Sequence, residues 1–499
     1  MPSRSRNHAG WLTRAAAAGL GLALASGCGI LRPGRHVDRQ VPPPAEVARA
    51  AAAAPEPSPP PPDAGAATAG DAAAAPRSLS DLVDRALTRD PSTRAAWQDA
   101  RATAAQAAGR RSLRLPGVGA SADLDRSRSG GAQGRAISIE TRASVGASLS
   151  WLLVDLTRGA LIDEGDRLAA AARLGEHAAV ADLVLRVQET YFQYLAARAL
   201  VEAETAAVTQ AETSLAAAEG RRRAGVATIA DVLQARTALS QVRLALQQVE
   251  GQALSLRGAL ATLAGLPPMA ALEVGVLPAR VETRAAEPVI EELLARAQAR
   301  NPDVAQAQAL ADAARARARA ASRAPWPVLS LQAGAGRSWP VTDEEGGGPL
   351  GDGTTTWSAG LSLTLPTFTG LRPVYEVLAA RAAADAARAR ADATGQRVAL
   401  DVWTSFQDLR TAGRRVETAR DLLESATASA AVAGGRYQEG VGSILDLLTA
   451  QAALESARAE EVRARADLLV AVARLARASG RLELPPPPDA ANPEESPAP

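Results

Sequence analysis

The sequence predicts a mostly helical chain made of a duplicated half, with two β-strands and two long helices in each copy. Three observations predict this fold class: an internal repeat that is too long for a solenoid, strict alternation of apolar and polar residues in four segments, and rows of apolar residues at heptad spacing. Ala dominates the hydrophobic fraction of 47%, and only 3% of the residues are aromatic. Closely packed Ala-rich helices are therefore favoured over a bulky globular core.

Composition excludes several classes of function. The formal net charge is only +1, which gives no reason to expect nucleic acid as a partner. One Cys and three His, far apart in the sequence, cannot form a disulfide or a structural zinc site within one chain. The sequence has no P-loop and no nucleophile-elbow motif. We therefore expect no enzyme activity, no cofactor and no metal centre.

The N-terminal residues 1–27 are typical of an export signal, with basic residues before an apolar stretch that is too short to span a membrane. Small residues precede Cys28, which resembles a bacterial lipoprotein signal in which the Cys is lipidated. By the same resemblance, Gly29 after the Cys points to the outer membrane. An ordinary secretory signal or a buried Cys are the alternatives. Residues 28–77 and 481–499 are rich in Pro and Ala, which predicts an extended spacer and a disordered tail.

The structural repeats are expected at residues 78–266 and 288–480, joined by a connecting segment at 267–287. The segment from Gly225 to Leu233 recurs from Gly440 to Leu448. Each half therefore has the same order of short helices, a β-hairpin and a pair of long helices.

The short helices are marked by their caps. Asp90 precedes Pro91 in the first half, and Asn301 precedes Pro302 in the second. Asp and Asn are good N-cap residues, and Pro fits the first turn of a helix. A helix is therefore predicted to begin at each of these Pro residues.

The strands are predicted by four segments in which apolar and polar side chains alternate. These segments cover residues 118–124, 137–153, 329–335 and 357–365. Gly-rich polar stretches at 125–136 and 341–354 predict solvent-exposed hairpin tips. Such strands are long enough to cross a bilayer at a tilt, although a soluble sheet with one wet face has the same pattern.

Four strands cannot close a barrel, because the bacterial minimum is about eight. An open sheet edge in lipid would leave backbone groups without hydrogen bonds. If the strands span a membrane, several copies of the chain must share one barrel.

The long helices carry apolar rows at heptad spacing, from Val180 to Leu215 and from Val402 to Leu423. Their partner helices carry two rows each, which predicts neighbours on two sides. This arrangement suits the wall of a tube. A coiled-coil stalk is the alternative.

The stretch from Arg436 to Leu454, echoed from Gly225 to Leu239, resembles the helix-turn-helix tip of the TolC-like outer-membrane efflux family. The resemblance implies a homotrimer with a shared twelve-stranded β-barrel in the outer membrane and an α-helical tunnel that projects into the periplasm. It also implies an exit duct for a tripartite pump that exports drugs, other small molecules or metals, with a periplasmic adaptor and an inner-membrane pump as partners. Type I protein secretion is possible within the family.

In that family, acidic residues near the tip narrow the tunnel mouth, and the matching positions here are Asp446 and Asp231. Each also fits a capping box, because a Ser or Thr lies three residues before it. Each Asp can therefore line a gate, cap a helix or do both, and the sequence does not decide between these roles. The second acid of the family pattern is replaced by Thr449, and a basic residue that holds some tips shut is replaced by Gly442.

Gly225 and Gly440 are predicted at the tip turns, where a positive φ is useful. Arg221, Arg222 and Arg223 precede the first turn only. Cations are favourable at a helix C-terminus, so a solvated run is one interpretation, and contact with an adaptor is the other.

The leading hypothesis is a passive, lipid-anchored outer-membrane channel with a gated periplasmic tip. A lipid-tethered periplasmic coiled-coil adaptor or scaffold is the alternative, but it would have no use for four alternating strands with polar tips.

Overall fold

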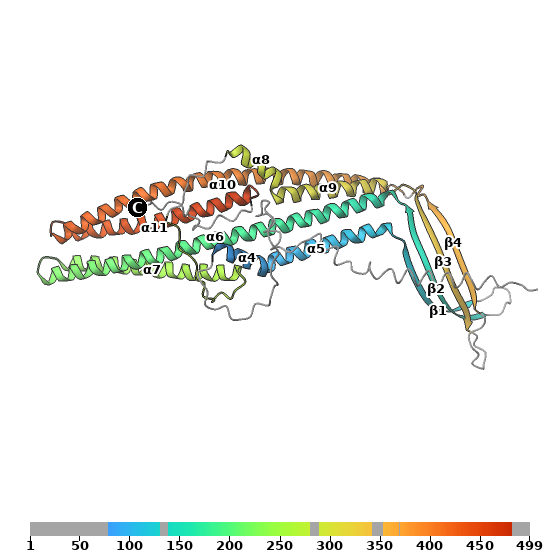
Figure 1. The fold of residues 1–499 in the computed structure, drawn as a ribbon, viewed down its shortest axis with the longest axis horizontal. Helices are drawn as coiled ribbons and strands as arrows, with labels where there is room; N and C mark the ends of the chain where they lie inside the picture. Colours follow the sequence, from blue (N-terminus) through green and yellow to red (C-terminus); the bar gives the residue numbers. More distant parts are fainter. Residues whose placement is uncertain (1–77, 130–137, 280–288, 342–352, 369, 482–499) are drawn as a thin grey trace, which may run out of the picture. The chain divides into compact units, whose positions relative to one another are not determined.

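The computed structural model describes residues 78–129, 138–279, 289–341, 353–368 and 370–481 (Figure 1). The predicted export signal (1–27), the spacer with Cys28 (28–77), nearly all of the tail (481–499), part of the connecting segment (280–287) and most of both predicted hairpin tips lie outside the described residues.

The two halves have the same order of elements, as the duplication predicts. The first half contains α4 (Leu79–Arg89), α5 (Pro91–Arg111), the short 3-10 helix η2 (Ser112–Arg114), β1 (Gly117–Ser129), β2 (Ser138–Val154), α6 (Leu156–Arg223) and α7 (Ile229–Leu263). The second contains α8 (Ile290–Arg300), α9 (Pro302–Arg323), β3 (Val328–Val341), β4 (Thr354–Thr364), α10 (Arg372–Gln438) and α11 (Ile444–Ala478). The predicted helix starts at Pro91 and Pro302 are confirmed. The mostly helical, duplicated fold class is confirmed as well.

The chain forms two compact units, each with segments from both halves. The sheet unit consists of Ala100–Ala172 and Ala307–Ala391 among the described residues. The helical unit consists of Arg173–Gln306 with residues 78–99 and 392–481.

The sheet unit holds one antiparallel sheet with the strand order β1-β2-β3-β4. Its register aligns the apolar rows: Val118 is opposite Leu149, Leu149 is opposite Ala333, and Ala333 is opposite Ala359. All apolar rows therefore share one face, which we call the apolar face. Several of its large side chains are exposed, among them Leu124, Leu361 and Trp357, of which Trp357 reaches 79%.

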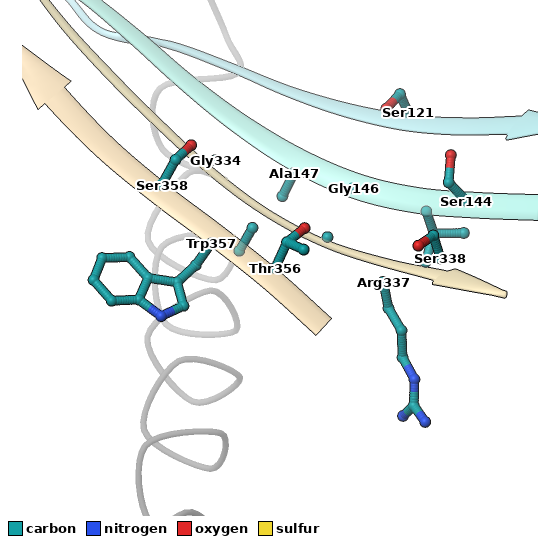
Figure 2. A pocket seen from close by; sticks show the side chains of 13 residues that line it. Ser121, Ser144, Gly146, Ala147, Gly334, Arg337, Ser338, Thr356, Trp357 and Ser358 are labelled. Carbon is teal, nitrogen blue, oxygen red and sulfur yellow. The ribbon is translucent and has the colours of Figure 1, made fainter. Parts of the chain in front are cut away.

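On the opposite face of the sheet, Ser, Thr and Gly surround a shallow hollow of 330 Å³, as Figure 2 shows. Gly146 of β2 is opposite Gly336 of β3. A Cβ at Gly336 would lie 3.0 Å from the Val145 carbonyl oxygen, so the close pairing of β2 and β3 requires Gly there.

The strands are longer than the apolar alternation predicts. Pairing continues past Leu124 with Asp125 opposite Arg142 and Arg126 opposite Thr141. β4 likewise begins at Thr354, inside the predicted loop. The prediction ended too early because polar residues occupy both faces here, while the backbone ladder still continues.

The helical unit consists of two helical hairpins, α6–α7 and α10–α11, with α4 and α8 packed against them. Helix α6 has 68 residues, about 100 Å at about 1.5 Å per residue. Its predicted row is buried at Val180 and Val187, and these side chains share a core with Leu260 of α7 and Val470 of α11. Between α10 and α11 the core is mainly Ala, which lets the two helices approach closely. No helix in the described ranges has an apolar stretch sufficient to cross a bilayer.

An ion-pair cluster around Arg477 joins three helices of the helical unit. The Arg477 side chain is only 14% exposed, and it donates to Asp182 of α6 at 2.7 Å and to Asp303 of α9 at 2.9 Å. Burial disfavours its charge, but the two carboxylates more than offset this and raise the pKa of Arg477. The cluster therefore ties the end of α11 to both neighbours.

We expect Arg477→Ala to lower the free energy of unfolding by about 2 kcal/mol, because a largely buried guanidinium and its ion pairs with the partly buried Asp303 and the more exposed Asp182 are lost. Urea unfolding of the detergent-solubilised protein, followed by helical circular dichroism, measures this. Arg474→Ala is the control, because Arg474 is half-exposed in its ion pair with Glu189. Its cost should stay below about 1 kcal/mol. Equal losses in the two variants would contradict the prediction.

Candidate functional site

The candidate site is the tip of the helical unit, where α6 turns into α7 and α10 turns into α11. Gly225 and Gly440 lie in these turns with φ of 79° and 81°. In the first turn, the amide of Val226 donates to the Arg221 carbonyl at 3.0 Å, and in the second the amide of Val441 donates to the Arg436 carbonyl at 3.0 Å. Such bonds close a helix C-terminus when the turn residue adopts a left-handed conformation.

The two tip carboxylates differ, although the sequence places both in the same pattern. The Asp231 carboxylate accepts from the Thr228 amide at 2.7 Å, and Thr228 Oγ1 accepts in return from the Asp231 amide. In the second tip, Ser443 Oγ accepts from the Asp446 amide at 3.1 Å. The exposed Asp446 carboxylate accepts no hydrogen bond from any residue that the structure describes. Asp231 is therefore part of a cap, whereas the Asp446 carboxylate is available to solvent or a ligand.

A small apolar cluster holds the two tips together. It contains Ala218, Val232, Ala235, Tyr437, Ile444 and Leu447, which come from α6, α7, α10 and α11. Tyr437 is only 6% exposed. Burial raises the pKa of the Tyr437 hydroxyl, Arg221 lowers it, and Asp231 raises it. Arg221 and Asp231 both come from the first hairpin, whereas Tyr437 belongs to the second.

Arg221 links the two hairpins. Its guanidinium carbon lies 4.7 Å from the centroid of the Tyr437 ring, and Nη1 donates to the Tyr437 carbonyl oxygen. Arg221 is half-buried, whereas Arg222 and Arg223 are exposed. The three basic residues, grouped by the sequence, thus have different environments. We call the contact between Arg221 and Tyr437 the tip latch.

Gly442 lies in the second tip turn, where the backbone leaves little room for a side chain. A Cβ at Gly442 would lie 3.1 Å from the Tyr437 amide nitrogen and 3.1 Å from the Arg436 carbonyl carbon. No side chain fits there without displacing the backbone. A side chain at position 442 is therefore disfavoured, and the cation beside Tyr437 is Arg221 of the first hairpin.

A polar cavity of 440 Å³ lies between α6, α7 and α11 in the helical unit. Glu204 and Glu455 face each other there, with Arg463 nearby. Burial, followed by the neighbouring Glu455 carboxyl, raises the pKa of Glu204 to about 7, although the positive charge of Arg463 acts in the opposite direction. The described residues contain no cluster of three or more metal-ligating side chains.

Protonation of Glu204 should make stability depend on pH. The folded chain holds this proton up to about pH 7, whereas an ordinary Glu titrates near 4.5. The contribution of protonated Glu204 to the free energy of unfolding is therefore fully present below about pH 4.5, and it is lost as the pH rises through 7. Glu204→Gln should flatten this part of the profile of unfolding free energy against pH. Glu202→Gln, an exposed position on the same helix, should not; an unchanged profile in Glu204→Gln would contradict the assignment.

Comparison with known proteins agrees with the fold. Residues 82–266 and 293–481 match the outer membrane efflux protein family. Protein CyaE of Bordetella pertussis is 30% identical, covering 81% of this chain and 84% of that protein. Outer membrane protein OprJ of Pseudomonas aeruginosa is 27% identical, covering 75% of this chain and 78% of that protein.

Solved structures agree with these relatives. The crystal structure of a membrane protein from Pseudomonas aeruginosa superimposes with a TM-score of 0.73 at 27% identity, and covers 81% of this chain and 93% of that one. The matches support an outer-membrane location and an efflux channel, and they give no support to the adaptor alternative. The chain therefore belongs to the outer membrane efflux protein family and is one of the TolC-like outer-membrane channels that its tip sequence resembles.

Proposed function

We propose that three copies of this chain close one β-barrel and one helical tunnel, and that the assembly is the exit duct of a tripartite efflux pump with a gated tip. The exposed apolar face of the sheet carries this proposal. Within the described residues, β1 and β4 end the sheet without a further strand beside them. A lipid-facing sheet needs every backbone group paired, so neighbouring copies must supply the missing strands.

The helical unit also offers surfaces for neighbouring copies. Large apolar side chains are exposed along α7 and α10, among them Leu244, Leu254, Leu400, Trp403 and Val432. Exposed apolar rows on helices of this length are typical of association with further helices. Three copies would give twelve strands, and a lipid on Cys28 would add an anchor to the outer membrane.

The Asp446 carboxylates would form the narrow part of the tunnel. Each is exposed and takes no part in its own cap, so three of them can face a common axis and bind cations. Asp231 contributes to the tip through its cap and through Tyr437.

The conductance of the purified full-length protein in planar bilayers tests this function. We expect a heat-labile oligomer that conducts ions and is blocked by Mg²⁺. In Asp446→Asn, the half-blocking Mg²⁺ concentration should rise about tenfold, or about 1.4 kcal/mol, because the carboxylates that attract the cation are neutralised.

Asp231→Asn is the matched control for that experiment. It should leave the Mg²⁺ block unchanged and cost up to about 1 kcal/mol of stability, because it weakens a capping box. A soluble monomer without conductance would contradict the channel itself. Unchanged block in Asp446→Asn would contradict only the proposed gate.

The tip latch would hold the closed state, since it joins the two hairpins of one chain. We expect Arg221→Ala to raise the open probability several-fold, because a charge-assisted contact worth about 1 kcal/mol is lost. The double variant Arg222→Ala/Arg223→Ala should leave conductance unchanged. It should instead lower cross-linking to the periplasmic adaptor in cells, because both side chains are exposed beside the turn. An unchanged open probability in Arg221→Ala, or unchanged cross-linking in the double variant, would contradict the corresponding assignment.

A further inference from the structure

A basic rim continues the apolar face of the sheet beyond its apolar rows. In β1, every second residue from Val118 belongs to the apolar face, and this series continues after Leu124 with Arg126 and Arg128. In β3, the corresponding series of every second residue begins with Leu329 and reaches Arg337. Side chains two positions apart in a strand share a face, so these three Arg belong to the face that carries the apolar rows. All three are exposed.

In each half of the duplicated chain, an Arg follows the first large apolar residue of its row by the same number of positions. Arg126 follows Val118 by eight positions, and Arg337 follows Leu329 by eight positions. Eight residues extend about 27 Å along a strand, which is about 20 Å of membrane depth at a tilt of about 40°. The apolar band of outer-membrane barrels is about 25 Å tall. The Arg side chains therefore lie near its outer boundary, at the hairpin end of the sheet.

An aromatic side chain marks the same boundary. Trp339 lies two positions beyond Arg337 on the same face, and the Arg337 guanidinium carbon is 5.5 Å from the centroid of its ring. Trp is enriched at membrane interfaces, because its ring is apolar and its N–H can reach polar groups.

The charge on this face is of one sign. The acidic residues of β1, Asp123 and Asp125, have the opposite parity and belong to the Ser-rich and Gly-rich face. In the described parts of the four strands, the apolar face has no Asp or Glu. Figure 2 shows the direction: Arg337 and Trp357 point away from the side occupied by Ser144 and Ser338. An anionic partner for this face must therefore approach from the lipid side.

We propose that Arg126, Arg128 and Arg337 form a binding surface for the phosphate groups of outer-leaflet lipids. A guanidinium binds phosphate through two parallel hydrogen bonds, which suits it for this ligand. At the interface the desolvation cost of Arg is small, about 0–1 kcal/mol, so the lipid phosphate provides a net gain. The surface rests on the proposed insertion of the sheet in the outer membrane.

Binding of a phosphorylated lipid A to the full-length oligomer in nanodiscs tests this surface, with the dephosphorylated lipid as the comparison. Native mass spectrometry counts the bound lipids. The unaltered protein should prefer the phosphorylated form. The triple variant Arg126→Gln/Arg128→Gln/Arg337→Gln should lose at least about tenfold in apparent affinity, which is about 1.4 kcal/mol.

Arg142→Gln is the matched control, because Arg142 is opposite Asp125 in the register and has the parity of the other face. It should retain the lipid. Unchanged binding in the triple variant, equal binding of the dephosphorylated lipid, or full competition by millimolar inorganic phosphate would overturn the proposal. Conductance is measured in parallel. If the unaltered protein conducts ions but shows no preference for the phosphorylated lipid, only the lipid surface is refuted. If the unaltered protein forms no oligomer and does not conduct, the channel itself is refuted.

Discussion

The architecture depends on one constraint, which is that the four strands leave an apolar sheet face and two sheet edges uncovered by the rest of the described chain. Backbone groups without partners are too costly in lipid. The duplication supplies two hairpins per chain, and their register places every apolar row on one face. Association with further copies is then the natural way to satisfy both the face and the edges.

The core of the helical unit is built from small side chains. The α10–α11 core consists mainly of Ala, and Ala464 within it is fully buried. Small side chains let long helices lie close together, although each contact contributes little hydrophobic free energy. Specific polar links, such as the Arg477 cluster, therefore matter more here than in a core of large side chains.

Much of the fold could be predicted from the sequence, because periodicity reports directly on which side of an element is covered. Strand ends were less predictable, since the ladder continues where both faces are polar, as at Asp125 and Arg142. At the tip, the same Ser/Thr-x-x-Asp pattern describes Asp231 and Asp446, yet only the Asp231 carboxylate completes the box. The sequence could not distinguish the role of Arg221 from those of Arg222 and Arg223, because its partner Tyr437 lies 216 positions away.

The tip also shows how the two halves have diverged while keeping one fold. Both turns retain Gly at a positive φ, so the backbone of the repeat is preserved. The first half has the basic run and a complete capping box, whereas the second has the buried Tyr437, the crowded Gly442 and the free Asp446 carboxylate. A latch requires two different surfaces, one with the cation and one with the aromatic ring. Divergence of the repeats supplies both within a single chain, so the contact between the two hairpins forms inside one subunit.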